Sequence, residues 1–76
     1  MEADATLDAT GTLCPIPIIW TAERIRELQV GQVLAVLATD EAILDDLPAW
    51  CRATGNEFLG FDQEPPVYRG YTRRSR

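Results

Sequence analysis

The stretch VLAVLAT, from Val33 to Thr39, is a nearly continuous run of apolar residues. Such a run is typical of a strand that is buried on both faces in the middle of a sheet. Gly31 stands just before it and closes the segment that precedes it. We therefore predict that this stretch is the central strand, and we place the other elements around it.

On the N-terminal side, the residue pattern predicts a strand and then an amphipathic helix. In ATLDAT, residues 5–10, Leu7 and Ala9 alternate with polar neighbours, which indicates a strand that ends at Gly11. The helix is expected from about Pro15 to Gln29. At about 100° per residue, its apolar face carries Ile18, Ala22, Ile25 and Leu28, and its polar face carries Trp20, Glu23, Arg24 and Glu27.

On the C-terminal side, DEAILDDLPAWCRATG, residues 40–55, predicts a second helix. Apolar side chains recur at helical spacing at Ile43, Leu47, Trp50 and Cys51, but a proline inside a helix removes a hydrogen bond and clashes with the preceding turn. We therefore expect a short turn from Asp40, followed by a helix with Asp46 as N-cap and Pro48 in its first turn. Gly55 is expected to end this helix.

Two further strands are predicted at residues 57–63 and 67–73, with Glu64-Pro65-Pro66 as the turn between them. The element order is then βαβαββ. A strand-helix-strand start implies a parallel pair with a right-handed crossover, and the closing hairpin adds an antiparallel pair. The expected fold class is α/β (α+β): a two-layer sandwich in which two helices cover one face of a four-stranded mixed sheet, as one domain over residues 1–76.

The stretch LCPIPI, residues 13–18, places a cysteine directly before the predicted helix. Prolines are tolerated in the first turn of a helix, so Pro15 and Pro17 indicate a helix start. The residue before a proline is pushed into an extended conformation, which favours Cys14 as the N-cap. The helix dipole and a free amide such as that of Ile16 would then stabilise a thiolate, so we predict a pKa below about 8.5 for Cys14.

Composition and charge exclude several other kinds of site. Twelve acidic and seven basic residues give a net charge of −5, which disfavours direct nucleic-acid binding. The chain has no histidine and only two cysteines, so we expect no metal site, no cofactor, no disulfide framework and no Cys–His dyad. No apolar run approaches the roughly 20 residues of a membrane span, and the acidic start MEADAT is unlike a signal peptide, so we expect a cytoplasmic protein.

Four of the seven arginines fall in the last eight positions: Arg69, Arg73, Arg74 and Arg76. They could form a local basic patch for an acidic partner. We favour the simpler interpretation, a solvated tail with little fixed structure.

Together, these features resemble the TusA/SirA family of small sulfur-carrier proteins over nearly the whole chain. The resemblance rests on LDATGTLCPIPIIWTAERI and TDEAILDDLPAWCRATGNEFL. Its landmarks are the Cys-Pro-x-Pro stretch at Cys14, Pro15 and Pro17, then Gly31, Asp40, the Asp46-x-Pro48 helix entry, Trp50 and Gly55. The resemblance implies a sandwich of two helices on a four-stranded mixed sheet, and a persulfide carried on Cys14.

The resemblance also implies partners. The sulfur donor is expected to be a cysteine desulfurase, a rhodanese or a DsrE-like protein, and the acceptor another protein in a sulfur relay. That relay could serve sulfur oxidation, transfer-RNA thiolation or molybdenum-cofactor supply. Many family members carry lysines where this chain has Trp20, Ala22 and Glu23, and a proline where it has Glu41. The acidic and aromatic helix face favours sulfur oxidation or molybdenum-cofactor supply over transfer-RNA thiolation.

We interpret the chain as a sulfurtransferase that acts as a protein-to-protein persulfide carrier. Each transfer step needs an exposed, deprotonated sulfur and no general base. The alternative is a thiol redox or regulatory module that uses Cys14 without moving sulfur. A disulfide between Cys14 and Cys51 would favour that alternative, whereas burial of Cys51 on the core face of the second helix is the simpler expectation.

The remaining candidates are split between function and structure. Trp20, with Arg24 one turn away, is either a docking anchor for a partner or a side chain folded over Arg24. Asp40, Asp46 and Gly55 are assigned to caps and turns and not to chemistry.

Overall fold

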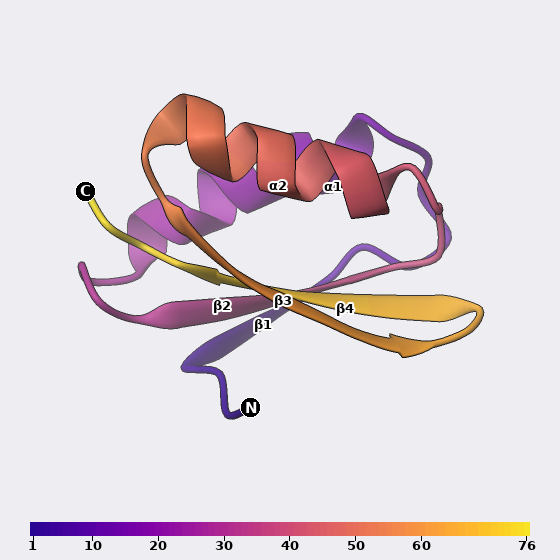
Figure 1. Ribbon diagram of the computed structural model, residues 1–76, viewed down its shortest axis with the longest axis horizontal. Coiled ribbons are helices and arrows are strands. Elements are labelled where there is room, and N and C mark those ends of the chain that lie inside the picture. The colour runs from indigo at the N-terminus through magenta and orange to yellow at the C-terminus, as the bar shows by residue number, and fades with distance from the viewer.

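Residues 1–76 are described by a computed structural model in which two helices lie on one face of a four-stranded sheet (Figure 1). The elements follow the order βαβαββ: β1 (Ala5–Asp8), α1 (Ile16–Arg24), a 3-10 turn η1 (Ile25–Glu27), β2 (Val33–Ala38), α2 (Ile43–Thr54), β3 (Glu57–Glu64) and β4 (Val67–Arg73). The predicted α+β sandwich is therefore confirmed. No helix is both long enough and apolar enough to span a membrane.

The sheet has the strand order β1-β2-β4-β3. Strands β1 and β2 are parallel, with Leu7 opposite Val36, whereas β4 runs antiparallel to both β2 and β3. The predicted parallel pair and closing hairpin are both present. Strand β2, the apolar run at Val33–Ala38, is an inner strand of the sheet, as its apolar pattern predicts. The other inner strand is β4, the last strand of the chain.

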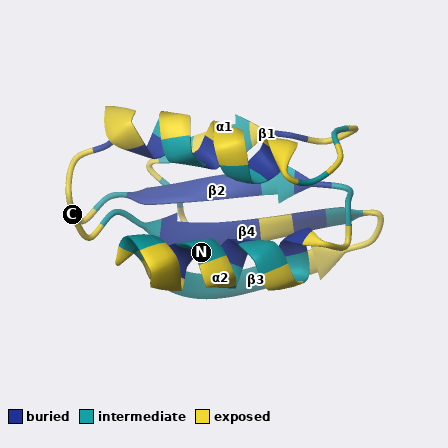
Figure 2. Ribbon diagram, turned by 90° about the horizontal axis from the view of Figure 1, so that it is seen from above, coloured by how far each residue is buried: buried dark blue, intermediate teal, exposed yellow.

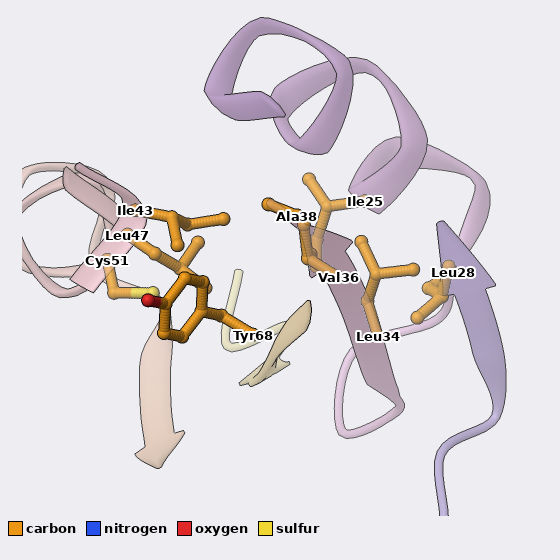
Figure 3. Close-up of a cluster of buried hydrophobic side chains, with 9 residues drawn as sticks. All are labelled: Ile25, Leu28, Leu34, Val36, Ala38, Ile43, Leu47, Cys51 and Tyr68. Atoms are coloured by element: carbon orange, nitrogen blue, oxygen red, sulfur yellow. The ribbon is translucent and has the colours of Figure 1, made fainter. Parts of the chain in front are cut away.

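The core fills the space between the sheet and the two helices. Figure 2 shows α1 above the β1–β2 half of the sheet and α2 above the β4–β3 half, each helix with its exposed residues turned away from the strands. Figure 3 shows the buried side chains that meet in this layer: Ile25, Leu28, Leu34, Val36, Ala38, Ile43, Leu47, Cys51 and Tyr68.

Helix α1 and the turn η1 together bury the predicted apolar face, on which Ala22 is only half-buried, and two residues are added to it. Ile25 and Leu28 are buried, and Ile18 packs against the core. Pro17 and Thr21 are also buried, and the Thr21 hydroxyl donates a hydrogen bond to the Pro17 carbonyl at 2.7 Å. That bond satisfies a polar side chain inside the core. The helical segment ends in the 3-10 turn at Glu27, two residues before the predicted end.

Helix α2 differs from the prediction at its start. The expected turn from Asp40 runs without a break into one helix, so Asp46 is inside α2 and not its N-cap, which is Ala42. The amides of Ile43 and Leu44 already donate to the carbonyls of Asp40 and Glu41. Burial of the apolar face in the first turn stabilises this continuous helix despite Pro48, whose missing N–H removes one hydrogen bond. Gly55 ends the helix in the left-handed conformation, as predicted.

The arginine-rich end of the chain is ordered, so the prediction of a solvated tail is wrong. Arg69 and Arg73 belong to β4, and Arg73 forms an ion pair with Glu57 on β3. The backbone of Arg74 pairs with Gly31 and Gln32, and its guanidinium donates to the carbonyl of Leu28. These bonds extend the pairing of β4 and satisfy a carbonyl at the end of the first helical segment.

Candidate functional site

Cys14 is half-buried in the loop between β1 and α1. The peptide bond from Cys14 to Pro15 is cis, and Pro15 is the N-cap of α1, so the prediction of Cys14 as N-cap is off by one residue. The Ile16 amide donates to the Leu13 carbonyl at 2.9 Å and is not free to face the sulfur. The Ile16 amide therefore does not supply the expected stabilisation of a Cys14 thiolate.

Asp40 holds the Cys14 loop in place. Its Oδ2 accepts a hydrogen bond from the backbone N–H of Cys14 at 2.8 Å, and its Oδ1 accepts one from the N–H of Ala42 at 3.0 Å. One carboxylate thus joins the loop before α1 to the start of α2. Both hydrogen bonds stabilise the carboxylate form of Asp40 and lower its pKa below the ordinary value. The bond from the Cys14 N–H has the larger effect.

The same surroundings act in the opposite direction on the thiol. Desolvation contributes most, followed by the nearby carboxylates of Asp46 and Asp40, and together they raise the pKa of Cys14 to about 11. The prediction of a lowered pKa is wrong. Desolvation and the two carboxylates therefore both favour the thiol over the thiolate in the unpartnered protein.

Asp40 and Asp46 are the site residues that sequence reasoning missed. Parallel strands bring their carboxyl ends to the same sheet edge, so the loops after β1 and β2 must meet there. A second bond confirms the approach of these loops, since the Gly11 amide donates to the Thr39 hydroxyl at 2.9 Å. The position of Asp40 directly after β2 was therefore a usable signal for its closeness to Cys14.

An apolar surface adjoins the cysteine on the α1 side. Leu13 is 75% exposed, Ile16 36% and Ile19 47%. Trp20, which is 39% exposed, lies at the next position of the helix. Of the three predicted helix-start residues, Pro15 and Ile16 are exposed, whereas Pro17 is buried against the fold. Exposed apolar side chains thus stand next to Cys14 in the sequence and along the start of α1, where a partner protein could cover them.

Trp20 and Arg24 lie on the polar side of α1, as predicted. They line a shallow hollow together with Leu7, Glu23 and Glu27. The guanidinium of Arg24 forms an ion pair with Glu27. Arg24 is therefore paired with a carboxylate in the same hollow that Trp20 lines.

Cys51 is buried, as predicted. Only 1% of its surface is exposed, and its Sγ lies 3.3 Å from the Thr72 hydroxyl inside the core. Burial is the main cause that raises its pKa. The two thiols are thus different in kind, because one reaches the surface and the other packs beneath α2.

Comparisons with known proteins agree with this geometry. A family model described as Sulfurtransferase TusA matches residues 5–74. The sulfur carrier protein TusA of Pseudomonas entomophila (strain L48) is 44% identical over 71 residues, which cover 93% of this chain and 89% of that protein. YrkF of Bacillus subtilis (strain 168) is 42% identical over 74 residues, but this chain spans only 40% of its length.

The fold is also found among solved structures. A crystal structure of a SirA-like protein from Desulfitobacterium hafniense matches with a TM-score of 0.80 and 25% identity, covering 95% of this chain and 99% of that one. The match includes the two helices and the mixed sheet that position the cysteine. The chain therefore belongs to the TusA sulfurtransferase family.

Proposed function

We propose that this chain is a sulfur carrier that accepts sulfane sulfur as a persulfide on Cys14 and passes it to an acceptor protein. The observation that carries the proposal is the contrast between the two thiols in a TusA-family fold. Cys14 reaches the surface at the start of α1, whereas Cys51 is buried in the core. Only Cys14 is accessible to another protein.

The proposed chemistry needs no redox cofactor. The Cys14 thiolate attacks the outer sulfur of a donor persulfide, forms the Cys14 persulfide and releases the donor as a thiolate. An acceptor thiolate then attacks the outer sulfur on Cys14 and releases the Cys14 thiolate. Each step makes one sulfur–sulfur bond and breaks one, so atoms and charge balance without an external oxidant.

The proposed partners are therefore two proteins with reactive sulfurs. A cysteine desulfurase, a rhodanese or a DsrE-like protein would serve as donor, in the cytoplasm, where thiols remain reduced. The exposed apolar residues beside Cys14 support docking of a protein surface in place of a small molecule. The acidic and aromatic face of α1 favours sulfur oxidation or molybdenum-cofactor supply as the pathway.

Intact-mass measurement tests the proposal. The chain is incubated with a cysteine desulfurase plus cysteine, and separately with polysulfide or thiosulfate. We expect a mass increase of one sulfur atom that a reducing agent removes, that Cys14→Ser abolishes and that Cys51→Ala retains. Sulfur uptake on Cys51, or none from any donor, would contradict the proposal. A Cys14–Cys51 disulfide on mild oxidation, without sulfur uptake, would instead support a redox module.

A further inference from the structure

The charged groups around Cys14 all have the same sign. Asp40 reaches the cysteine from the loop after β2 through its bond to the backbone N–H at 2.8 Å. Asp46 lies in the first turn of α2, and its negative charge also acts on the thiol. The charges that act on this sulfur are therefore two carboxylates and no cation.

A reactive cysteine ordinarily lies in an electropositive setting, which stabilises the attacking thiolate. Here the setting is reversed, and an approaching reagent meets negative charge at the sulfur. Free polysulfide and thiosulfate are anions, so the two carboxylates repel them. A protein that places a lysine or arginine beside its own reacting sulfur would be attracted, and would offset the charge that disfavours the Cys14 thiolate.

On the basis of the proposed function, we propose that Asp40 and Asp46 make Cys14 selective for sulfur donors and acceptors that carry a positive charge beside the reacting sulfur. Asp40 does this while its hydrogen bond positions the cysteine loop, and Asp46 does it through its negative charge. The exposed apolar residues at the start of α1 form the rest of the docking surface. A matching partner would therefore carry a basic group next to its reacting sulfur and an apolar area beside that group.

In the proposed encounter, the partner's cation lies against Asp40 and Asp46, and the Cys14 thiol loses its proton to solvent. The thiolate attacks the outer sulfur of the donor persulfide, and the donor leaves as a thiolate that its own basic group stabilises. Selectivity thus arises because a matching cation offsets the negative charge that disfavours the Cys14 thiolate, which is the attacking group at loading and the leaving group at delivery.

Small disulfides of defined charge test this inference without any sulfur donor. The rate of mixed-disulfide formation on Cys14 is measured by intact mass with cystamine, which is a dication, and with dithiodipropionate, which is a dianion. Each rate is divided by that of a free model thiol under the same conditions. The Cys14 thiolate attacks one sulfur of the disulfide, and the other half leaves as a thiolate.

We expect the wild-type chain to favour cystamine over dithiodipropionate by more than the model thiol does. Asp46→Asn should reduce this preference by up to about thirtyfold, because one unit charge roughly 4 Å away in water changes each rate by about fivefold to sixfold, and in opposite directions for the cation and the anion. Asp40→Asn should reduce it similarly, and asparagine keeps one of the two acceptors that hold the loop. Asp45→Asn is the matched control, because Asp45 is exposed in the same turn of α2 and should leave the preference unchanged.

An equal preference in Asp46→Asn and Asp45→Asn would overturn the inference, as would a wild-type preference no larger than that of the model thiol. The outcome is separable from that of the proposed function. Charge selectivity with no sulfur uptake from any donor would leave the selectivity standing and remove the carrier role. Sulfur uptake without charge selectivity would remove this inference alone.

Discussion

The carboxylate of Asp40 and the backbone N–H of Cys14 are joined by a hydrogen bond of 2.8 Å, across 26 positions of sequence. This bond connects the loop that follows one parallel strand with the loop that follows its neighbour. Its geometry places the cysteine at the shared edge of β1 and β2, beside the first turn of α2. The position of the reactive sulfur therefore depends on a residue distant in the chain.

The Asp40 bond should depend on acid pH. The pKa of Asp40 in the folded state is below its ordinary value of 3.8, so the folded state favours the carboxylate. The contribution to stability is therefore complete above that ordinary pKa and is lost as the pH falls through the lowered folded value. We expect the amide resonance of Cys14 to shift in that acid range in NMR spectra. Asp40→Asn is the control, and an identical acid shift in that variant would contradict the assignment.

Cys14→Ser should fold normally and carry no sulfur. Cys14 is only half-buried and lies outside the core, so the substitution should change the free energy of unfolding by less than about 0.5 kcal/mol. Urea unfolding measures this change, and intact mass after exposure to a sulfur donor measures uptake. A loss of several kcal/mol would show that the thiol supports the fold, and retained uptake would assign the reaction to Cys51.

Trp20→Ala should separate docking from folding. The indole is 39% exposed on the polar side of α1, so its removal should leave the melting temperature nearly unchanged. An aromatic anchor in a partner pocket can contribute about 2 kcal/mol or more to binding, so sulfur transfer with the cognate protein should slow. Reaction of Cys14 with free polysulfide should not change. Equal transfer rates with the protein partner would exclude Trp20 from the interface.

Gly70→Ala should destabilise the fold. Gly70 lies in β4 beneath α2, and a Cβ there would overlap Cδ2 of Leu47 and come within 2.9 Å of Cε1 of Phe61. Crowding of this kind in a packed core costs about 1–3 kcal/mol, which chemical denaturation measures. The double variant with Leu47→Ala is the control, because it removes the overlapping atom. Alanine at position 70 should then cost less than in the wild-type background, and an equal cost would show that Leu47 is not the obstacle.

Local patterns in the sequence determined the elements of this fold. The apolar run at Val33–Ala38 predicted an inner strand, and the spacing of Ile25 and Leu28 predicted the buried face of the first helical segment. Burial of Cys51 followed in the same way from its place on the core face of α2. These predictions hold because side-chain periodicity alone decides which face of a helix or strand leaves water.

Only the tertiary structure decided the chemistry around the cysteine. The sequence places Asp40 and Asp46 far along the chain from Cys14, and nothing in the local pattern shows that desolvation and these two carboxylates together raise its pKa to about 11. The pKa depends on charges and desolvation in space, which arise only when the loops after β1 and β2 meet. The continuous helix through Pro48 has a similar origin, because the burial that stabilises its first turn comes from packing on the sheet.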